Sequence, residues 1–484
     1  MSEESLKNKT IKGISWSAAD AFVGHGITFV VGIVLARLLT PAEYGLIGIC
    51  MIFITILNGI VDSGFSTAII RKKTVTKDDY NTMFITNLAI SVILAIILCL
   101  FAPWISFFFK REELTSLIRV MSILLVINAF SLTQITILTR NVDFKTRTKA
   151  SLISAVLSGF AGILFAFLGF GVWALVLQQI LKQLLNTICL WFYNKWHPSL
   201  SFSKDSFYYM WGFGSKLMIS GLLENIWNQA YQIVVGKFYS PTTLGQYTKA
   251  REFANIFSTN INSIVMRVSY PVLSSIQDDY TRMKNVYQKI IKITMFVTTM
   301  LLIPLAAVSE PLIYCLIGPK WQEASTYLPL ICIIMSFYPL QAINLNMLKV
   351  LGRSDIFLYI EIIKKIIAIA PLLIGIYYNI YWMLIVSIIT TIISFFLNSW
   401  YSGNKIGYTS FKQLMDIIPN YFLACLIAIS VYFFKYLNLP HFTILLLQLF
   451  VGSLVFFFIV NIFNIQEYIE IKRIVRDFIA KKSN

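Results

Sequence analysis

Charged and amide side chains interrupt a segment near residue 257 that lies in a largely apolar chain. Lys249, Arg251, Glu252, Asn255 and Arg267 all fall within this segment. Ionisable groups inside a membrane are costly and usually face a cavity or one another. The segment is therefore predicted to line a cavity, where its cations can bind anions and its amide can hydrogen-bond polar groups. The alternative is that these groups only hold helices together, with Lys249 and Glu252 as an i,i+3 ion pair.

Three other apolar segments also carry polar residues. The first holds Asp20 and Thr28 on one helical face, with His25 beside them and Arg37 at the far end. The second holds Asp62. The segment near residue 223 holds a lysine, a carboxylate, amides and a tryptophan, many of them at helical spacing: Lys216, Glu224, Asn225, Trp227, Asn228, Gln229 and Gln232. These segments are the first two of each half of the chain, so each half is predicted to present a polar face.

The composition identifies the class of protein that holds these groups. Of 484 residues, 57% are hydrophobic and 13% charged, with a mean hydropathy of +0.73, which leaves too little polar surface to cover a soluble core. Apolar runs long enough to cross about 30 Å of hydrocarbon recur along the chain. We expect an all-α polytopic membrane protein of about 14 spans, centred near residues 25, 55, 95, 127, 160, 182, 223, 257, 300, 336, 365, 390, 425 and 452.

The distribution of Lys and Arg predicts the orientation. With the N-terminus in the cytoplasm, 29 of the 40 Lys and Arg residues lie on the cytoplasmic side and 7 on the other side. Four lie inside spans: Lys182, Lys216, Lys249 and Arg251. Both termini are therefore predicted to be cytoplasmic. Membrane topology and anionic headgroups account for most of the net charge of +17, so no nucleic-acid partner is expected.

A repeat relates the two halves. Residues 233–283 match residues 33–83 at a constant offset of 200, with eleven of fifty-one positions identical. Pro41 and Gly45 return as Pro241 and Gly245, and an acidic pair, Asp78-Asp79, returns in register. Such self-similarity at a fixed period indicates a duplication. Six spans separate the copies, so they share one orientation and their symmetry axis is predicted to follow the membrane normal.

These observations divide the chain into five parts. We expect a cytoplasmic N-terminal segment (1–12), an N-lobe of six helices (13–205) and a C-lobe of six helices (206–401). Two unpaired helices (402–466) and a cytoplasmic tail (467–484) follow.

Motifs for chemical catalysis are absent from the sequence. It contains no Walker motif, no GxSxG elbow, no HExxH and no CxxC, and its three histidines do not cluster. We therefore expect no catalytic residues, no metal site and no cofactor.

One stretch carries a family resemblance. The first span ends in Arg37-Leu38-Leu39-Thr40-Pro41-Ala42-Glu43-Tyr44-Gly45, and an apolar second span with Asp62-Ser63-Gly64-Phe65 follows. The chain resembles the Wzx-type polysaccharide flippases of the MOP (multidrug/oligosaccharidyl-lipid/polysaccharide) exporter superfamily. This resemblance implies the MOP flippase fold, with two pseudo-symmetric six-helix lobes and two extra helices. The implied activity is alternating-access transfer of an undecaprenyl-diphosphate-linked oligosaccharide to the periplasmic leaflet for cell-surface polysaccharide, in the bacterial inner membrane.

The resemblance also gives the polar residues roles. Diphosphate-binding candidates are Arg37, Lys216, Lys249, Arg251 and Arg267. Glycan-binding candidates are Asn225, Trp227, Asn228, Gln229, Gln232 and Asn255. Candidates for charge balance or a coupling ion, H⁺ or Na⁺, are Asp20, His25, Asp62, Glu224 and Glu252. Other expected partners are membrane lipids, a polymerase and further glycan-assembly proteins.

Two other classes remain open at this stage. A drug or cation exporter of the same superfamily would share the fold, but it should expose acidic groups in its cavity. A membrane-embedded glycan-processing enzyme would need a catalytic base or a sizeable extracytoplasmic loop.

Overall fold

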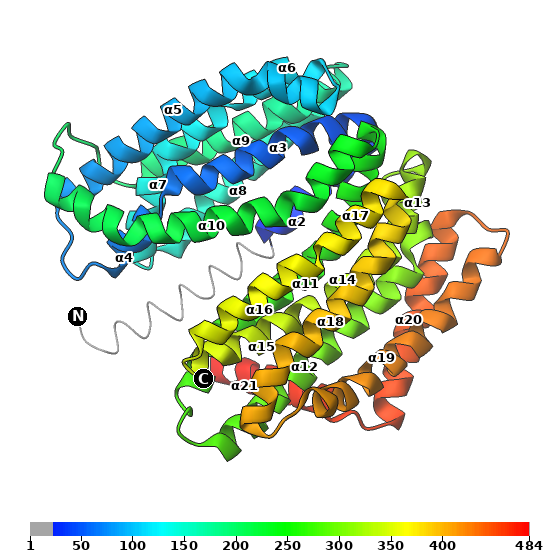
Figure 1. The fold of residues 1–484 in the computed structure, drawn as a ribbon. Coiled ribbons are helices and arrows are strands. Elements are labelled where there is room, and N and C mark those ends of the chain that lie inside the picture. The colour runs from blue at the N-terminus through cyan, green and yellow to red at the C-terminus, as the bar shows by residue number, and fades with distance from the viewer. Residues whose placement is uncertain (1–22, 484) are drawn as a thin grey trace. The chain divides into compact units, whose positions relative to one another are not determined.

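The computed structural model describes residues 23–483, and every regular element in this range is a helix (Figure 1). The chain forms two compact units, divided between Gly245 and Gln246. The helices of the first unit are α2 (His25–Leu38), α3 (Pro41–Asp62), α4 (Phe65–Arg71), α5 (Lys77–Phe109), α6 (Glu113–Met121), α7 (Ile123–Arg140), α8 (Phe144–Phe167), α9 (Val172–Tyr193) and α10 (Lys204–Phe238).

The second unit contains most of α11 (Pro241–Ser274), whose first turn belongs to the first unit. The other helices are α12 (Tyr280–Ala307), α13 (Ser309–Leu316), η2 (Pro319–Trp321), α14 (Gln322–Ser336), α15 (Tyr338–Val350), α16 (Ser354–Ile367), α17 (Ile369–Tyr377), α18 (Ile380–Ile406), α19 (Ser410–Tyr432), η3 (Phe433–Tyr436), α20 (His441–Ile462) and α21 (Gln466–Ser483).

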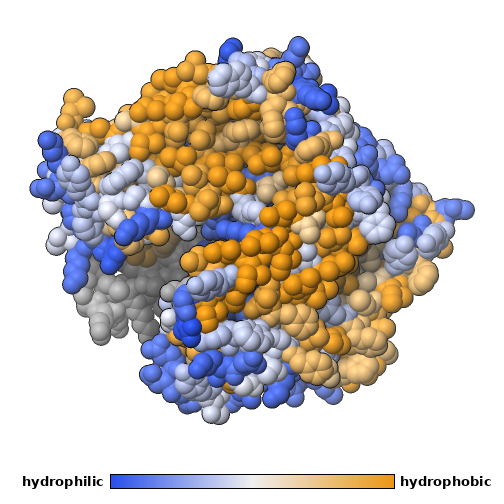
Figure 2. Space-filling model, in the orientation of Figure 1, coloured by the Kyte–Doolittle hydropathy of each residue, from blue (hydrophilic) through white to orange (hydrophobic). Residues whose placement is uncertain are grey.

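The membrane class is confirmed by the length and composition of these helices. Within the described residues, ten helical segments are long and apolar enough to cross a membrane. Apolar residues also cover broad stretches of the surface (Figure 2). Each predicted span centre falls in a helix or at the junction of consecutive helices. However, α2 is short, and α10, α11 and the α16–α17 pair are not among the ten, so the total of fourteen spans stays a prediction.

The compact units do not coincide with the predicted lobes. The sequence boundary at 205/206 assigns α10 to the C-lobe, whereas α10 packs against α3, α4 and α5 within the first unit. The boundary between the compact units reflects which helices pack together, whereas the predicted lobe boundary reflects where the sequence repeat begins. The two boundaries therefore describe different properties. The predicted lobes therefore stay a prediction.

The start of α3 is determined by local chemistry. Thr40 caps the helix, and its hydroxyl and backbone N–H both bond the Glu43 carboxylate, at 2.8 and 2.6 Å. Pro41 occupies the first turn, where its missing N–H costs nothing. In the other copy of the repeat, Ser240 caps α11 by accepting a hydrogen bond from the Thr243 N–H at 3.1 Å.

The two copies of the Pro-x-x-x-Gly motif touch each other inside the first unit. A methyl group at Gly45 would lie 1.8 Å from the Pro241 carbonyl oxygen, and one at Gly245 would lie 1.9 Å from the Pro41 oxygen. Each glycine therefore lets the other helix's first turn approach to backbone contact. This reciprocal contact is what a twofold relation between the two motif copies produces.

A break divides the second predicted span. Ser63 (φ 50°) and Gly64 (φ 68°) adopt left-handed conformations and separate α3 from α4. A methyl group at Gly64 would also lie 2.7 Å from the Gly214 oxygen of α10, so this glycine serves both the turn and the packing.

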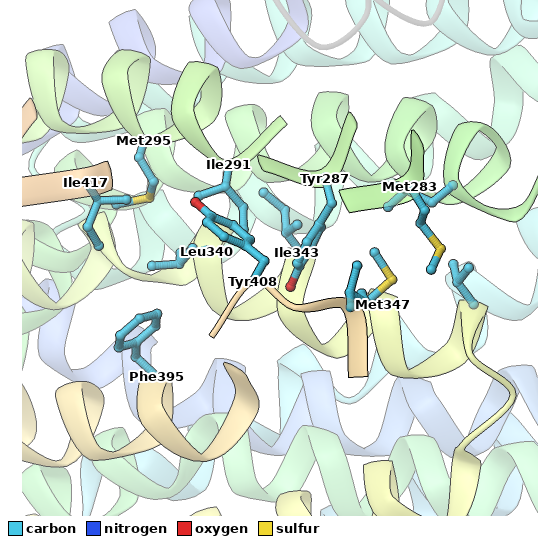
Figure 3. Close-up of a cluster of buried hydrophobic side chains, with 13 residues drawn as sticks. Met283, Tyr287, Ile291, Met295, Leu340, Ile343, Met347, Phe395, Tyr408 and Ile417 are labelled. Atoms are coloured by element: carbon cyan, nitrogen blue, oxygen red, sulfur yellow. The ribbon is translucent and has the colours of Figure 1, made fainter. Parts of the chain in front are cut away.

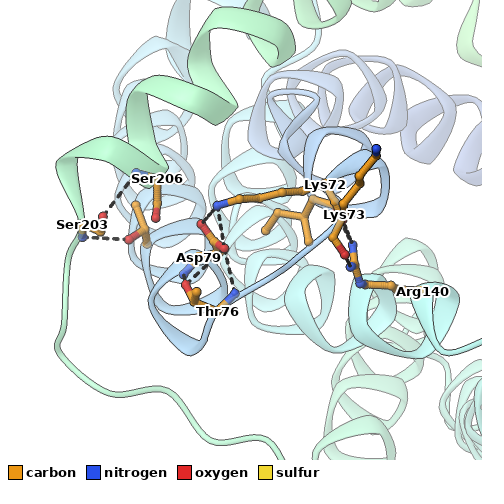
Figure 4. A network of polar contacts seen from close by, with 9 residues as sticks. Lys72, Lys73, Thr76, Asp79, Arg140, Ser203 and Ser206 are labelled. Atoms are coloured by element: carbon orange, nitrogen blue, oxygen red, sulfur yellow. Dashed lines mark hydrogen bonds and ion pairs between the residues drawn. The ribbon is translucent and has the colours of Figure 1, made fainter.

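A network of polar contacts closes the junction between α4 and α5 (Figure 4). Asp79 is only 1% exposed; it caps α5 together with Thr76 and pairs with Lys72 at 2.7 Å. Arg140 donates to the carbonyls of Ile69 and Lys72, at 2.6 Å each. Asp79 therefore has a structural role at this junction. The matching Asp279 also caps its helix, α12, by accepting from the Arg282 N–H at 2.9 Å.

The core of the second unit lies between α12, α15, α18 and α19. Figure 3 shows Tyr287 and Ile291 of α12 facing Ile343 of α15, with Tyr408 and Ile417 from the α19 side. One carboxylate ties this core together. Asp416 of α19 accepts hydrogen bonds from the Tyr408 hydroxyl and the Gln288 amide, at 2.7 Å each, and pairs with Lys292 at 3.1 Å.

Candidate functional site

The second unit carries the polar stripe of α11. Lys249 is 4% exposed, and its ammonium lies 2.8 Å from the Glu252 carboxylate, whose side chain is 41% exposed. The i,i+3 ion pair named in the alternative interpretation is therefore present, and the cavity lining stays a prediction. Arg251 is half-buried and lies beside the buried Tyr247. Lys249 is thus neutralised by a carboxylate, while Arg251 lies beside a neutral group.

Further polar groups follow along α11. Asn255 is half-buried, and Arg267 is exposed near the other end of the helix. The Oδ1 atom of Asn262 is buried and makes no hydrogen bond within the described residues. A buried acceptor without a partner is unusual, and it is satisfied when water or a ligand occupies the adjacent space.

In the first unit, the predicted residues of α10 spread around the helix. Lys216, Glu224 and Asn228 are exposed, whereas Trp227, Gln229 and Gln232 are half-buried. Asn225 is half-buried and faces α3, because a methyl group at Gly59 would lie 2.6 Å from its Nδ2 atom.

The remaining predicted residues of this unit lie in α2 and α3. Asp62, at the end of α3, accepts a hydrogen bond from the Ser66 hydroxyl at 2.5 Å. Arg37, in the last turn of α2, is exposed. His25 begins α2, but its side chain is outside the described part, as is all of Asp20.

The structure brings together a chain of amides that the sequence analysis did not select. Asn128 of α7 donates to Asn58 of α3 at 2.9 Å, and Gln183 of α9 donates to Asn128 at 3.1 Å. Gln183 also reaches Ser131 at 3.4 Å. One sequence pattern could have indicated this chain of amides. Polar residues recur one helical turn apart inside an apolar span, at Gln178, Gln179, Lys182 and Gln183.

An apolar cavity lies within the second unit. It has a volume of about 570 Å³ and is lined by residues of α11, α12, α13, α19 and α20, among them Phe257, Met300 and Phe456. One amide, Gln448, lies in this wall; its Nε2 donates to the Val431 carbonyl at 2.9 Å, while its buried Oε1 makes no hydrogen bond. The cavity suits a hydrocarbon chain, with one acceptor available for a polar group.

The family is given by a direct match. Residues 34–326 match the model of a family described as "Polysaccharide biosynthesis protein". The chain belongs to this family. The matched range includes α3, α10 and α11, which hold most of the predicted site residues.

Characterised relatives agree with this assignment. The chain is 26% identical to the teichuronic acid biosynthesis protein TuaB of Bacillus subtilis (strain 168), over 73% of this chain and 74% of the relative. It is 24% identical to the succinoglycan biosynthesis transport protein ExoT of Rhizobium meliloti (strain 1021), over 74% and 73%. It is also 24% identical to the lipopolysaccharide biosynthesis protein WzxC of Escherichia coli (strain K12), over 77% and 76%. The resemblance to Wzx-type flippases is confirmed.

Solved structures confirm the fold. The lipid II flippase MurJ, in an inward closed conformation, aligns with a TM-score of 0.72 over 93% of this chain and 98% of MurJ, at 16% identity. An inward-facing multidrug resistance MATE family transporter of the MOP superfamily aligns with a TM-score of 0.60, over 80% and 98%, at 15% identity. The chain therefore has the MOP fold predicted from its sequence.

Proposed function

We propose that this protein transfers undecaprenyl-diphosphate-linked glycan repeat units from the cytoplasmic to the periplasmic leaflet, for the synthesis of a cell-surface polysaccharide such as lipopolysaccharide, capsule or exopolysaccharide. The observation that carries this proposal is membership of the polysaccharide biosynthesis family, with relatives named for polysaccharide transport and assembly. The MOP fold supports a transport role by alternating access. The protein then acts as a transporter and not as an enzyme.

The polar residues suit the head of such a substrate. A diphosphate that leaves water needs cations or several donors in place of its hydration shell. Arg251 is the strongest of the predicted cations, because it is half-buried, lies beside the neutral Tyr247 and forms no ion pair with a carboxylate of the described residues. Lys249 is a weaker candidate for binding the diphosphate, because Glu252 already neutralises its charge. The half-buried amides Asn225, Gln229, Gln232 and Asn255 supply hydrogen bonds for sugar hydroxyls, and Trp227 supplies an aromatic face.

The apolar cavity of the second unit suits the other end of the substrate. An isoprenoid chain is uniformly apolar, and the side chains of Met300, Phe456 and their neighbours give it a matching surface. A single protein unit thus offers both a polar stripe on α11 and an apolar wall, the two chemistries that a lipid-linked sugar combines.

The proposal includes a location and partners. The protein resides in the bacterial inner membrane with both termini in the cytoplasm, in accord with the distribution of Lys and Arg. It receives its substrate from the enzymes that assemble the lipid-linked unit and delivers it to a polymerase. An H⁺ or Na⁺ gradient drives transport, with Asp62, Glu224 or Glu252 as candidate carriers.

Deletion of the gene, combined with reconstitution of the protein, tests this function. In the deletion strain, the completed oligosaccharide should accumulate on its diphosphate lipid in the cytoplasmic leaflet while its assembly enzymes remain active. Purified protein in liposomes should carry a fluorescent lipid-linked oligosaccharide to the far leaflet under an ion gradient. Arg251→Ala should slow transport roughly tenfold or more, because it removes a charge-assisted bond. Lys405→Ala, which removes an exposed cation outside the stripe, is the matched control.

Two results would contradict the proposal. Loss of assembly of the lipid-linked unit in the deletion strain would favour a glycan-processing enzyme. Normal glycan export together with increased sensitivity to cationic drugs would favour a drug exporter of the same fold.

A further inference from the structure

Lys182 is a charged residue near the middle of α9, in a segment apolar enough to span the membrane. Its side chain is half-buried. No carboxylate of residues 23–483 lies within ion-pair distance of its ammonium group. Its position inside a span is evident from the sequence, but no motif there indicates a role for it. It therefore differs from Lys249 and Lys72, both of which pair with carboxylates.

The hydrogen bond of this lysine within the described residues is to a neutral group. Its ammonium donates to the Thr28 hydroxyl of α2 at 3.5 Å. The next residue, Gln183, belongs to the chain of amides that joins α9 to Asn128 of α7 and through it to Asn58 of α3. Amides and hydroxyls solvate a charge in part, but they do not balance it.

A cation in this setting is retained at a cost to stability. An ammonium group within a membrane span cannot face lipid, so it must face water or a ligand inside the protein. An apolar residue of similar length would fill the same position without that cost. A charged residue that weakens the fold and pairs with no carboxylate of the described residues is what a binding site for an anion would retain.

We propose that Lys182, with Thr28, forms an anion-binding subsite of the first unit that takes up anionic oxygens of the lipid-linked glycan. This inference rests on the proposed function and adds to it a binding residue on α9, outside α10 and α11. The ammonium supplies the charge, the Thr28 hydroxyl supplies a second hydrogen bond, and the adjacent amides supply donors for neighbouring hydroxyls. The anionic oxygens belong either to the diphosphate or to a carboxylate on an acidic sugar.

Binding to the full-length purified protein tests the subsite. Lys182→Met keeps the length of the side chain and removes the charge, and it should weaken binding of undecaprenyl diphosphate roughly 10- to 100-fold. Lys182→Arg should retain binding, and Thr28→Val should weaken it less than Lys182→Met. Lys204→Ala, which removes an exposed cation of the same unit, is the matched control and should bind as the unaltered protein does. A soluble glucuronate-containing oligosaccharide is the second probe; if its binding alone is lost, the anion is the sugar carboxylate.

Thermal stability provides a readout that separates binding from structure. Lys182→Met should melt at the same temperature as the unaltered protein or higher, because the variant no longer buries an unbalanced charge. A lower melting temperature would mean that a carboxylate outside residues 23–483, such as Asp20, already neutralises Lys182, and it would overturn the subsite. Unchanged binding of both probes in Lys182→Met would overturn it as well.

The transport assay distinguishes failure of the subsite from failure of the function. If the unaltered protein transports the lipid-linked oligosaccharide and Lys182→Met transports it equally well, the proposal of the Lys182 subsite is wrong and the proposed flippase function is supported. If the unaltered protein transports no lipid-linked oligosaccharide, the proposed function itself is wrong, and Lys182 then has no glycan to bind.

Discussion

The two copies of one repeated segment, α3–α4 and α11, begin alike and differ at most positions of their interiors. Both start with a capped Pro-x-x-x-Gly turn, at Pro41–Gly45 and Pro241–Gly245. In α3 the positions that follow are apolar and buried, with Ile49 at 0% and Ile52 at 1% exposure. The matching positions in α11, at an offset of 200, are Lys249 and Glu252. One copy thus carries an ion pair where the other carries a hydrophobic contact.

The ends of the two copies differ as well. Ser63 and Gly64 break the first copy into α3 and α4, whereas α11 runs unbroken from Pro241 to Ser274 and has Ile264 at the position of Gly64. The proline and glycine that both copies keep at their starts are the residues that backbone contact requires. The features that differ are side chains and the local turn, which each half can change without separating the helix starts.

The largest expected effect concerns what the copies share. Gly45→Ala and Gly245→Ala should each destabilise the protein by at least ~3 kcal/mol, because the new methyl group would lie within 2 Å of a carbonyl oxygen in the other helix. The measurement is the amount of monodisperse protein in membranes and its melting temperature. Gly212→Ala is the matched control, since a methyl group there has nothing within 4 Å; it should be neutral or stabilising by up to ~1 kcal/mol. Normal yields of Gly45→Ala would show that the contact is not tight in the membrane.

The next effect concerns the acidic residue that follows each copy. Asp79→Ala should cost roughly 2–4 kcal/mol, because it removes a cap and the partner of Lys72 from a position that is 1% exposed. Asp279→Ala should cost only ~1 kcal/mol, since the exposed Asp279 loses little besides its cap. Melting temperatures of the two variants measure the difference. Equal losses would mean that the ion pair adds no stability to the cap.

The smallest change in stability should come from exchanging the interiors. Lys249→Ile with Glu252→Ile places the α3 residues in α11, and it should leave stability unchanged or raise it by less than ~1 kcal/mol, because Lys249 is buried while the Glu252 side chain is 41% exposed. Transport should nevertheless fall, because the stripe loses a cation and a carboxylate. Full transport by a stable double variant would assign the pair to helix packing alone.

The sequence predicted much of the fold because the determining signals are long. A span requires about twenty apolar residues, and a duplication places matching residues at one offset over fifty positions. A single atypical residue therefore does not change either prediction. The repeat identified α11 as a helix although its hydropathy excludes it from the ten segments that could span a membrane. The breaks at Ser63–Gly64 and between α16 and α17 were not predicted, because they depend on tertiary contacts of a few residues.

The site was harder to predict, since its residues are single and their environments are tertiary. Charge alone did not distinguish Lys249, whose carboxylate is on its own helix, from Lys182, which among the described residues bonds the Thr28 hydroxyl and no carboxylate. Whether a lysine is paired with a carboxylate depends on how the helices pack, and no local sequence pattern indicates it. The Asn58–Asn128–Gln183 chain joins three helices for the same reason, and it became visible only in the structure.

The contact between Gly45 and Pro241 also sets an order of events during synthesis. About 200 residues separate its two sides, so α3 enters the membrane long before the partner of its first turn has been translated. The early helices must therefore insert into the membrane before the first turns of α3 and α11 are in contact. This contact can form only after Gly245 has been translated. In a chain that stalls earlier, the first turn of α3 would lack this contact.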